Sequence, residues 1–185
     1  MAFDFFNESR ESHDFHTSPT PSISTLEQMG GISYEQYFDI TKDSKEHHAL
    51  LKALKLSSLT PVVKSYGTKL EYHCYFSQGL SLCFESGKLE SIDFYKNQKP
   101  SSSSPVGNSE PYSSVKPENL PDFIGFNMTG KQLIEKFGEP VEKGGGLSQK
   151  LDIWLRWSGF QVEIGSRDWD AAKDIEWSSL TIFKK

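Results

Sequence analysis

The stretch Phe38-Asp39-Ile40-Thr41 recurs 88 positions later as Phe126-Asn127-Met128-Thr129. Each copy opens a stretch of helical spacing that leads to a proline and then to alternating apolar strands. A second match has the same offset, because Ser91-Ile92-Asp93-Phe94-Tyr95-Lys96 corresponds to Ser179-Leu180-Thr181-Ile182-Phe183-Lys184. A recurrence over roughly 60 residues is typical of tandem supersecondary units that cover each other's apolar surface. The sequence therefore predicts an internal repeat.

Each predicted unit is a helix followed by three antiparallel strands. In the first unit, Asp43 and Glu46 resemble a capping box, and helical spacing continues over 44–56. In the second unit, Thr129 is the expected N-cap and Gly138 the expected end of a shorter helix. We therefore expect an α+β fold with the helices on one face of a curved antiparallel sheet. The expected strands are 70–76, 80–84 and 92–94 in the first unit, and 151–157, 160–164 and 179–184 in the second.

The predicted units are preceded and joined by polar segments. Residues 1–24 are acidic and show no sustained period, so we expect a disordered arm before the first repeat, 25–96. Residues 97–119 are rich in serine and proline and are the expected linker to the second repeat, 120–185. Phe3-Asp4-Phe5-Phe6 in the arm is either a docking motif or a cluster that packs on the domain. Three sites precede proline and are candidates for phosphorylation by a proline-directed kinase: Ser18, Thr20 and Ser104.

Composition and charge argue against a membrane protein, a secreted protein and a nucleic-acid-binding protein. The 185 residues are 36% hydrophobic with a mean hydropathy of -0.53, and no apolar run approaches the roughly 20 residues that cross a bilayer. The first residues lack a basic stretch followed by an apolar one, so we expect no secretory signal and a cytoplasmic or nuclear protein without membrane insertion. The net charge is -5 and the pI about 5.6. Without a basic stripe, nucleic acid is not an expected partner.

The two cysteines are expected to be reduced. A turn at Ser77-Gln78-Gly79 would place Cys74 opposite Leu82 and Cys83 opposite His73. The two thiols would then lie on opposite faces of the sheet, which excludes a disulfide between them. Reduced thiols are typical of an intracellular protein.

The second helix carries a family resemblance. The stretch Met128-Thr129-Gly130-Lys131-Gln132-Leu133-Ile134-Glu135-Lys136-Phe137-Gly138-Glu139-Pro140 resembles the helix of β-lactamase inhibitor proteins and of the related outer-membrane assembly lipoproteins. Those families place this helix before a curved antiparallel sheet, and the inhibitors carry two such units in tandem. The first unit matches more faintly, because Gly138 has no counterpart there. No cysteine precedes Cys74, so lipid anchoring is not carried over. The resemblance implies a binding scaffold that uses the open concave face of a sheet.

Strand parity predicts which side chains the open face displays. We expect it to carry His73, Tyr75, Cys83, Tyr95, Trp154, Arg156, Glu163, Thr181 and Phe183. Aromatic and arginine side chains are common in binding hot spots, and a merely solvated face would favour lysine, glutamate and threonine. The alternative is that the arm or the linker covers this face. The expected partner-binding residues are Tyr75, Tyr95, Trp154, Arg156, Trp169 and Phe183.

Trp169 is included because it lies in an insertion, residues 166–176, that the first unit lacks. Recognition residues often lie on such loops, although a tryptophan there also folds back as a lid. The patterns typical of catalysis are weak. His47 and His48 are adjacent on a helix and point in different directions. Residues 144–146 form a Gly-Gly-Gly stretch that lacks the rest of a phosphate loop and is expected to be a flexible turn. Cys83 near His73 lacks an orienting third group.

The sequence thus predicts a protein without enzymatic activity, cofactor or metal. We expect it to bind another protein, as an adaptor or an inhibitor, through the exposed aromatic face of the sheet. The alternative is a carrier of a small ligand or lipid, with a pocket between the helices and the sheet.

Overall fold

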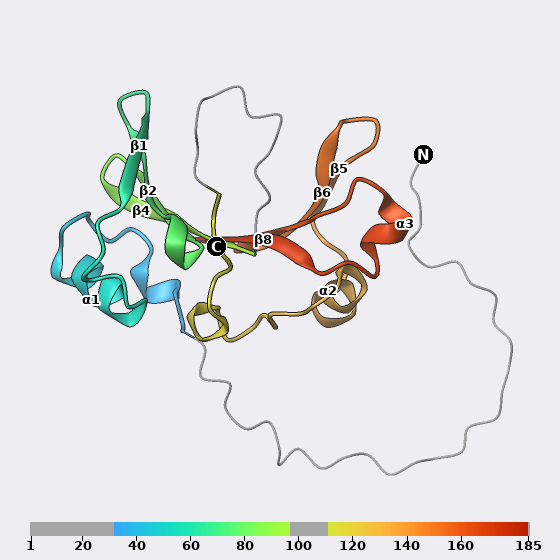
Figure 1. Cartoon of the computed structure of the whole chain (residues 1–185), viewed down its shortest axis with the longest axis horizontal. Helices are drawn as coiled ribbons and strands as arrows, with labels where there is room; N and C mark the ends of the chain where they lie inside the picture. Colours follow the sequence, from blue (N-terminus) through green and yellow to red (C-terminus); the bar gives the residue numbers. More distant parts are fainter. Residues whose placement is uncertain (1–31, 97–110, 185) are drawn as a thin grey trace, which may run out of the picture.

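An eight-stranded antiparallel sheet dominates the structure, a computed structural model that describes residues 32–96 and 111–184 (Figure 1). Its strand order is β1-β2-β3-β4-β8-β7-β6-β5, so the first four strands and the last four meet where β4 pairs with β8. We call residues 32–96 the first half and 111–184 the second half. The strands are β1 (Val62–Tyr66), β2 (Leu70–Tyr75), β3 (Leu80–Glu85), β4 (Lys88–Tyr95), β5 (Glu142–Gly146), β6 (Leu151–Trp157), β7 (Phe160–Ile164) and β8 (Trp177–Phe183).

The predicted fold class was wrong, because this is a mainly-β protein and not a tandem repeat of one helix and three strands. Each half contributes four strands. The sequence pattern did not predict two strands, β1 and β5. Most of their residues are exposed on both faces or are glycine, so the strands show no apolar alternation. Among the described residues there are only three short α-helices: α1 (Lys45–Ala53), α2 (Gly130–Phe137) and α3 (Trp169–Ala172). Three 3-10 turns complete the elements: η1 (Glu35–Tyr37), η2 (Phe76–Gln78) and η3 (Pro117–Asn119).

Side-chain caps start the two longer helices. The Ser44 hydroxyl accepts a hydrogen bond from the backbone N–H of His47 at 3.1 Å, so Ser44, and not Asp43, is the N-cap of α1. Thr129 caps α2 as predicted, in a reciprocal capping box with Gln132. Gly138 ends this helix with a φ of 76°, a conformation that favours glycine.

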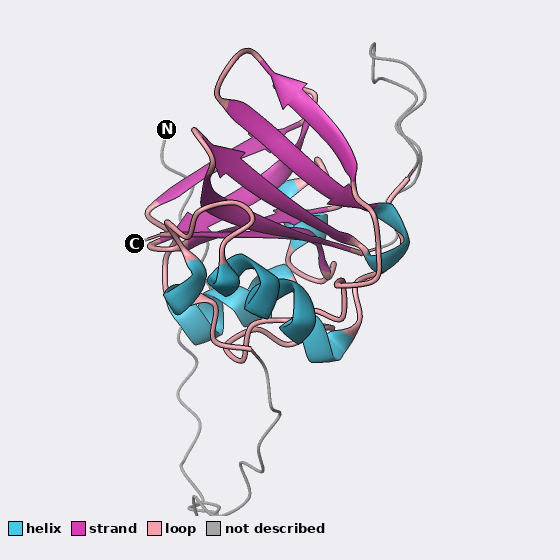
Figure 2. Ribbon diagram, turned by 90° about the vertical axis from the view of Figure 1, so that its left-hand side faces the viewer, coloured by secondary structure: helices cyan, strands magenta, loops and turns pink. Residues whose placement is uncertain are grey.

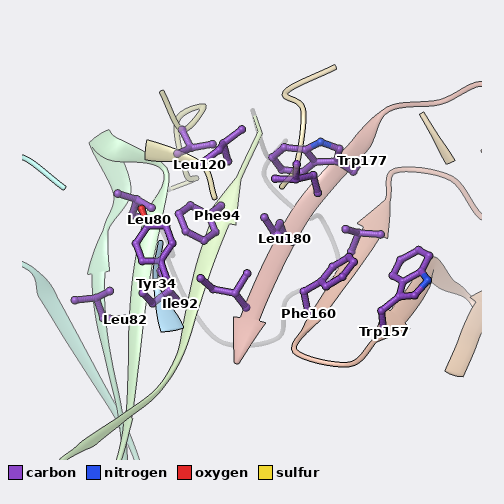
Figure 3. Close-up of a cluster of buried hydrophobic side chains, with 14 of the residues drawn as sticks. Tyr34, Leu80, Leu82, Ile92, Phe94, Leu120, Trp157, Phe160, Trp177 and Leu180 are labelled. Carbon is purple, nitrogen blue, oxygen red and sulfur yellow. The ribbon is translucent and has the colours of Figure 1, made fainter. Parts of the chain in front are cut away.

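The hydrophobic core lies between the sheet and the helices and runs without a break through both halves (Figures 2 and 3). Phe94 and Leu180 are fully buried on the adjacent strands β4 and β8. Trp157 and Phe160 stack with ring centroids 5.0 Å apart in the second half. Tyr34 from the first half donates a hydrogen bond to the backbone carbonyl of Asn119 in the second, at 2.6 Å. The two halves therefore share one core.

The junction between the halves is paired over five residues of each strand. Ser91–Tyr95 of β4 lies against Ser179–Phe183 of β8, and Asp93 is opposite Thr181, 88 positions away. The Lys96 ammonium adds an ion pair with Glu176, at 2.5 Å, and donates to the Phe126 carbonyl at 2.7 Å.

The predicted register of β2 and β3 was wrong by one residue. Because Phe76–Gln78 forms η2 and Gly79 follows in the left-handed region, Cys74 lies opposite Ser81 and Cys83 opposite Tyr72. Cys74 and Cys83 consequently share one face, contrary to the prediction, and both are free thiols. The same shift turns Tyr75 and His73 toward the helices, opposite Leu80 and Leu82.

Part of the expected linker packs on the domain. Residues 97–110 lie outside the described residues, as do the predicted arm 1–24 and the sites Ser18, Thr20 and Ser104. The remainder, 111–119, returns along the end of the sheet, where the Ser113 and Val115 N–H groups donate to Phe76 and Tyr95 carbonyls. No helix within the described ranges has the length and hydropathy of a membrane span.

Candidate functional site

Within residues 32–96 and 111–184, no helix lies on one face of the sheet. In Figure 1 the β1–β2 and β5–β6 hairpins rise at the two ends of the sheet, on the side away from α1 and α2, which makes this face concave. Because residues opposite each other in an antiparallel pair point to the same side, the registers determine its members. We call this the uncovered face; it includes Tyr72, Cys74, Ser81, Cys83, Asp93, Tyr95, Trp154, Arg156, Glu163, Ser179, Thr181 and Phe183.

The centre of the uncovered face is acidic and hydrogen-bonded. The Asp93 carboxyl group is buried and accepts hydrogen bonds from the Thr181 hydroxyl, at 2.7 Å, and the Ser81 hydroxyl, at 3.3 Å. On the neighbouring strands, the Ser179 hydroxyl donates to the Glu163 carboxylate at 2.8 Å. Burial raises the pKa of Asp93 to about 6, and the hydroxyl donors oppose that rise. This centre is therefore suited to a partner group that carries a positive charge or donates hydrogen bonds.

Tyrosines border the acidic centre on the first-half side. The ring of Tyr95 stacks on that of Tyr112 at 3.9 Å between centroids, and Tyr112 also contacts Phe76 at 4.6 Å. Burial raises the pKa of both Tyr72 and Tyr95, so both phenols stay neutral at physiological pH. An open hollow of about 430 Å³ lies beside them and is lined by Lys64, Tyr66, Leu70, Tyr72, Cys74, Ser81, Tyr95 and Tyr112. The predicted site residue Tyr95 is thus partly covered by the end of the expected linker.

Trp154 and Arg156 border the centre on the second-half side. Trp154 is half-buried and lies across Gly144 of β5, where an added Cβ would be only 2.6 Å from the indole ring. The exposed Arg156 guanidinium pairs with Glu142 at 3.1 Å and lies 5.0 Å from the centre of the Phe183 ring. This places three of the predicted site residues on one side of the uncovered face.

The other two predicted site residues lie elsewhere. Tyr75 faces the helices with 4% of its surface exposed, so its predicted exposure was wrong. Trp169 begins α3 and packs half-buried against the core, next to Gly146, as expected of a tryptophan that folds back. Asp168 caps that helix by accepting a hydrogen bond from the Asp170 N–H at 2.9 Å.

The groups considered for catalysis are dispersed. The described residues contain no group of three His, Cys, Asp or Glu side chains arranged to hold a metal. His47 is buried on α1 with Nδ1 accepting from the Asp43 N–H at 3.0 Å, and burial lowers the pKa of its imidazole. The glycines 144–146 belong to β5 and not to the flexible turn that was predicted. Cys83 is separated by the sheet from His73, which faces the helices and contacts the Glu71 carboxylate at 2.5 Å.

Sequence reasoning missed Asp93, Tyr72 and Tyr112 as members of the site. Asp93 shares the parity of Tyr95 and stands between Ile92 and Phe94, so an acid between two apolar residues was the available signal. Tyr72 was left out of the predicted open face because of the register error, and Tyr112 lies in the expected linker.

The resemblance to β-lactamase inhibitor proteins stays a prediction from one short motif. The chain matches no protein-family model, no curated protein and no solved structure in the comparisons.

Proposed function

We propose that this protein is a non-catalytic binding module, an adaptor or an inhibitor, that holds another protein against the uncovered face of its sheet. The observation that carries the proposal is the buried carboxyl group of Asp93, held at the centre of a concave face that none of the described helices covers. A buried ionisable group lowers stability unless it is compensated. Its position between aromatic and arginine side chains supports a role in recognition.

The chemistry of the face suggests what the partner supplies. A lysine or arginine of the partner would compensate the acidic centre formed by Asp93 and Glu163. Beside the acidic centre, Trp154 offers an apolar contact. Arg156 can donate to an acidic group of the partner, because the ion pair of Arg156 with Glu142 is exposed and weak. Protein complexes of standard size bury about 800 Å² on each side, and a concave eight-stranded face can supply that area.

Affinity purification with the full-length chain and its variants tests the proposal. We expect Trp154→Ala and Arg156→Ala each to reduce recovery of the partner at least tenfold, with melting temperatures close to that of the unchanged protein. Lys131→Ala is the matched control, because Lys131 is exposed on α2 at the opposite side of the sheet. Undiminished recovery with both variants would contradict the proposal, and so would an equal loss with the control.

A second function is favoured by a groove on the helix side of the sheet. It has a volume of about 690 Å³, within the range of small-molecule sites, and six of the fifteen residues that line it are aromatic. A carrier of a small apolar ligand or lipid would use this groove. Native mass spectrometry of the purified protein separates the two functions, since a bound small molecule would support the carrier.

A further inference from the structure

The groove opens where the helix layer leaves the end of the sheet uncovered. Its lining includes Phe38 of the first half together with Phe123, Phe137 and Phe160 of the second. The ring centres of Phe123 and Phe137 lie 5.1 and 4.9 Å from that of Phe160, so three of these rings form one cluster. Phe38, Phe123 and Phe137 are only half-buried. The groove therefore presents aromatic edges that lack full cover from the described residues.

The occupant that fits this groove is apolar and aromatic. The charged residues of the lining are Glu35, Asp122 and Lys184, all of them exposed, and Lys184 is ion-paired with Asp39. Aromatic side chains pack edge to face or offset against such rings, with centroids about 4.5–7 Å apart. A short segment with several phenylalanines matches both the chemistry and the size of the groove.

The chain itself carries such a segment next to the groove. Ile32, the first described residue, is part of the lining, and the preceding 31 residues contain Phe3, Phe5 and Phe6 within four positions. The 25 residues between Phe6 and Ile32 can extend over about 80 Å. The phenylalanines are therefore tethered closely enough to reach the groove. A tethered segment also stays near its site at any dilution of the protein.

We propose that Phe3, Phe5 and Phe6 dock into this groove in the same molecule. The docked segment covers the half-buried rings of the groove. The proposal does not rest on the proposed partner binding through Trp154 and Arg156, which lie on the opposite side of the sheet; Phe183 borders both surfaces.

Photo-crosslinking of the full-length chain tests this docking. Benzoylphenylalanine placed at position 5 is irradiated in dilute protein, and the crosslinked monomer is digested and mapped by mass spectrometry. We expect crosslinks to the lining segments 121–123 and 158–160. Adding Phe3→Ser and Phe6→Ser to the same probe should lower the yield at least tenfold, because the probe position is kept while two docking rings are lost.

A matched pair of tryptophan substitutions, one inside the groove and one outside it, tests whether docking needs the groove to be open. Ser158→Trp fills the groove from an exposed turn position and should also lower the crosslink yield at least tenfold. Leu147→Trp, at an exposed position that does not line the groove, should leave the yield unchanged, and circular dichroism of both variants verifies the fold.

Crosslinks scattered over the surface, crosslinks on the uncovered face, or crosslinked dimers in place of monomers would each overturn the proposal. A small molecule bound to the protein in native mass spectrometry, together with an absence of crosslinks to the groove, would overturn it as well. Partner recovery with Trp154→Ala is a separate readout, so failure of one proposal does not affect the other.

Discussion

At the scale of single residues, Asp93 most distinguishes the uncovered face from an ordinary solvated sheet face, because its carboxyl group is buried there. Removing a carboxylate from water disfavours its charged form, and two hydroxyl donors compensate only part of that loss. The folded protein consequently holds the Asp93 proton more tightly than the unfolded chain, with a pKa of about 6 against 3.8. This residue therefore makes a negative contribution to stability at neutral pH.

We predict that Asp93→Asn stabilises the protein at pH 7 by about 3 kcal/mol. Between pH 4 and 6 the folded state of the unchanged protein binds more protons than the unfolded state, so stability falls as pH rises through this window. The asparagine has no such dependence, and the advantage should vanish at pH 4. Urea denaturation at both pH values measures it. The exposed Asp122→Asn is the control, and a less stable Asp93→Asn protein at pH 7 would contradict the interpretation.

His47 should have the opposite dependence on pH. Its pKa is lowered chiefly by burial, with further lowering by His73, His48 and Lys42 and an opposing effect of Asp43. Its Nε2 atom has no hydrogen-bond partner among the residues that the structure describes. Stability is therefore complete above the unfolded pKa of about 6.5 and falls as pH drops below it.

We predict that the unchanged protein loses about 1 kcal/mol more than His47→Leu between pH 7 and pH 5.5. Leucine fills the same apolar site beside Phe84 without a group that takes up a proton. Thermal melts across this range compare the two proteins. His48→Gln, at an exposed position, should keep the dependence of the unchanged protein; if His47→Leu also keeps it, the dependence has another origin.

At the scale of elements, β5 shows how glycines are used in a strand. Gly144 lies opposite Trp154, and the absence of a side chain lets the indole ring lie across the neighbouring strand. Gly145 and Gly146 have φ values of 87° and 108° at an irregularity in the β5–β6 pairing, which other residues adopt only with strain. Gly144 therefore leaves room for the Trp154 ring, whereas Gly145 and Gly146 permit the irregular backbone of β5.

We predict that Gly144→Ala displaces the Trp154 ring while the sheet remains folded. A methyl group 2.6 Å from the indole cannot be accommodated without movement of the ring. The indole N–H resonance of Trp154 should shift, whereas that of Trp177, which donates to the Gly125 carbonyl at 2.9 Å, should not. Gly67→Ala at the β1–β2 turn, where a Cβ has open space but φ is 64°, is the control for strain without contact. Unchanged Trp154 resonances would contradict this prediction.

The sequence predicted the second-half strands better than those of the first. Ile153, Leu155 and Trp157 alternate without interruption, and the structure buries all three as expected. In the first half, η2 takes up Phe76, so the turn is one residue longer than predicted and every parity assignment in β2 is reversed. A one-residue difference in a turn cannot be read from apolar alternation, which is compatible with either register.

At the scale of the whole molecule, the junction of β4 and β8 determines whether the two halves unfold together. The halves share one core, and Leu180 in the central strand is fully buried opposite Phe94. In the sequence, the pairing of β4 with β8 was indicated only by the two matching stretches 88 residues apart, because pairing between distant strands leaves no local pattern.

We predict that Leu180→Ala destabilises the protein by about 3 kcal/mol and that both halves respond together. Native-state hydrogen exchange should show equal losses of protection in β2–β3 and in β6–β7. Leu147→Ala, at an exposed turn position, should have no effect. A loss confined to β5–β8 would show that the halves unfold independently.

The strand order has a further consequence for assembly. The β4–β8 ladder is the only strand pairing between the first four strands and the last four in the described sheet. If that ladder opens, each half exposes an unpaired inner edge whose complement exists in every other copy of the chain. Two molecules can then exchange their β5–β8 halves and restore every native contact, so partial denaturation at high concentration should favour domain-swapped dimers over disordered aggregates.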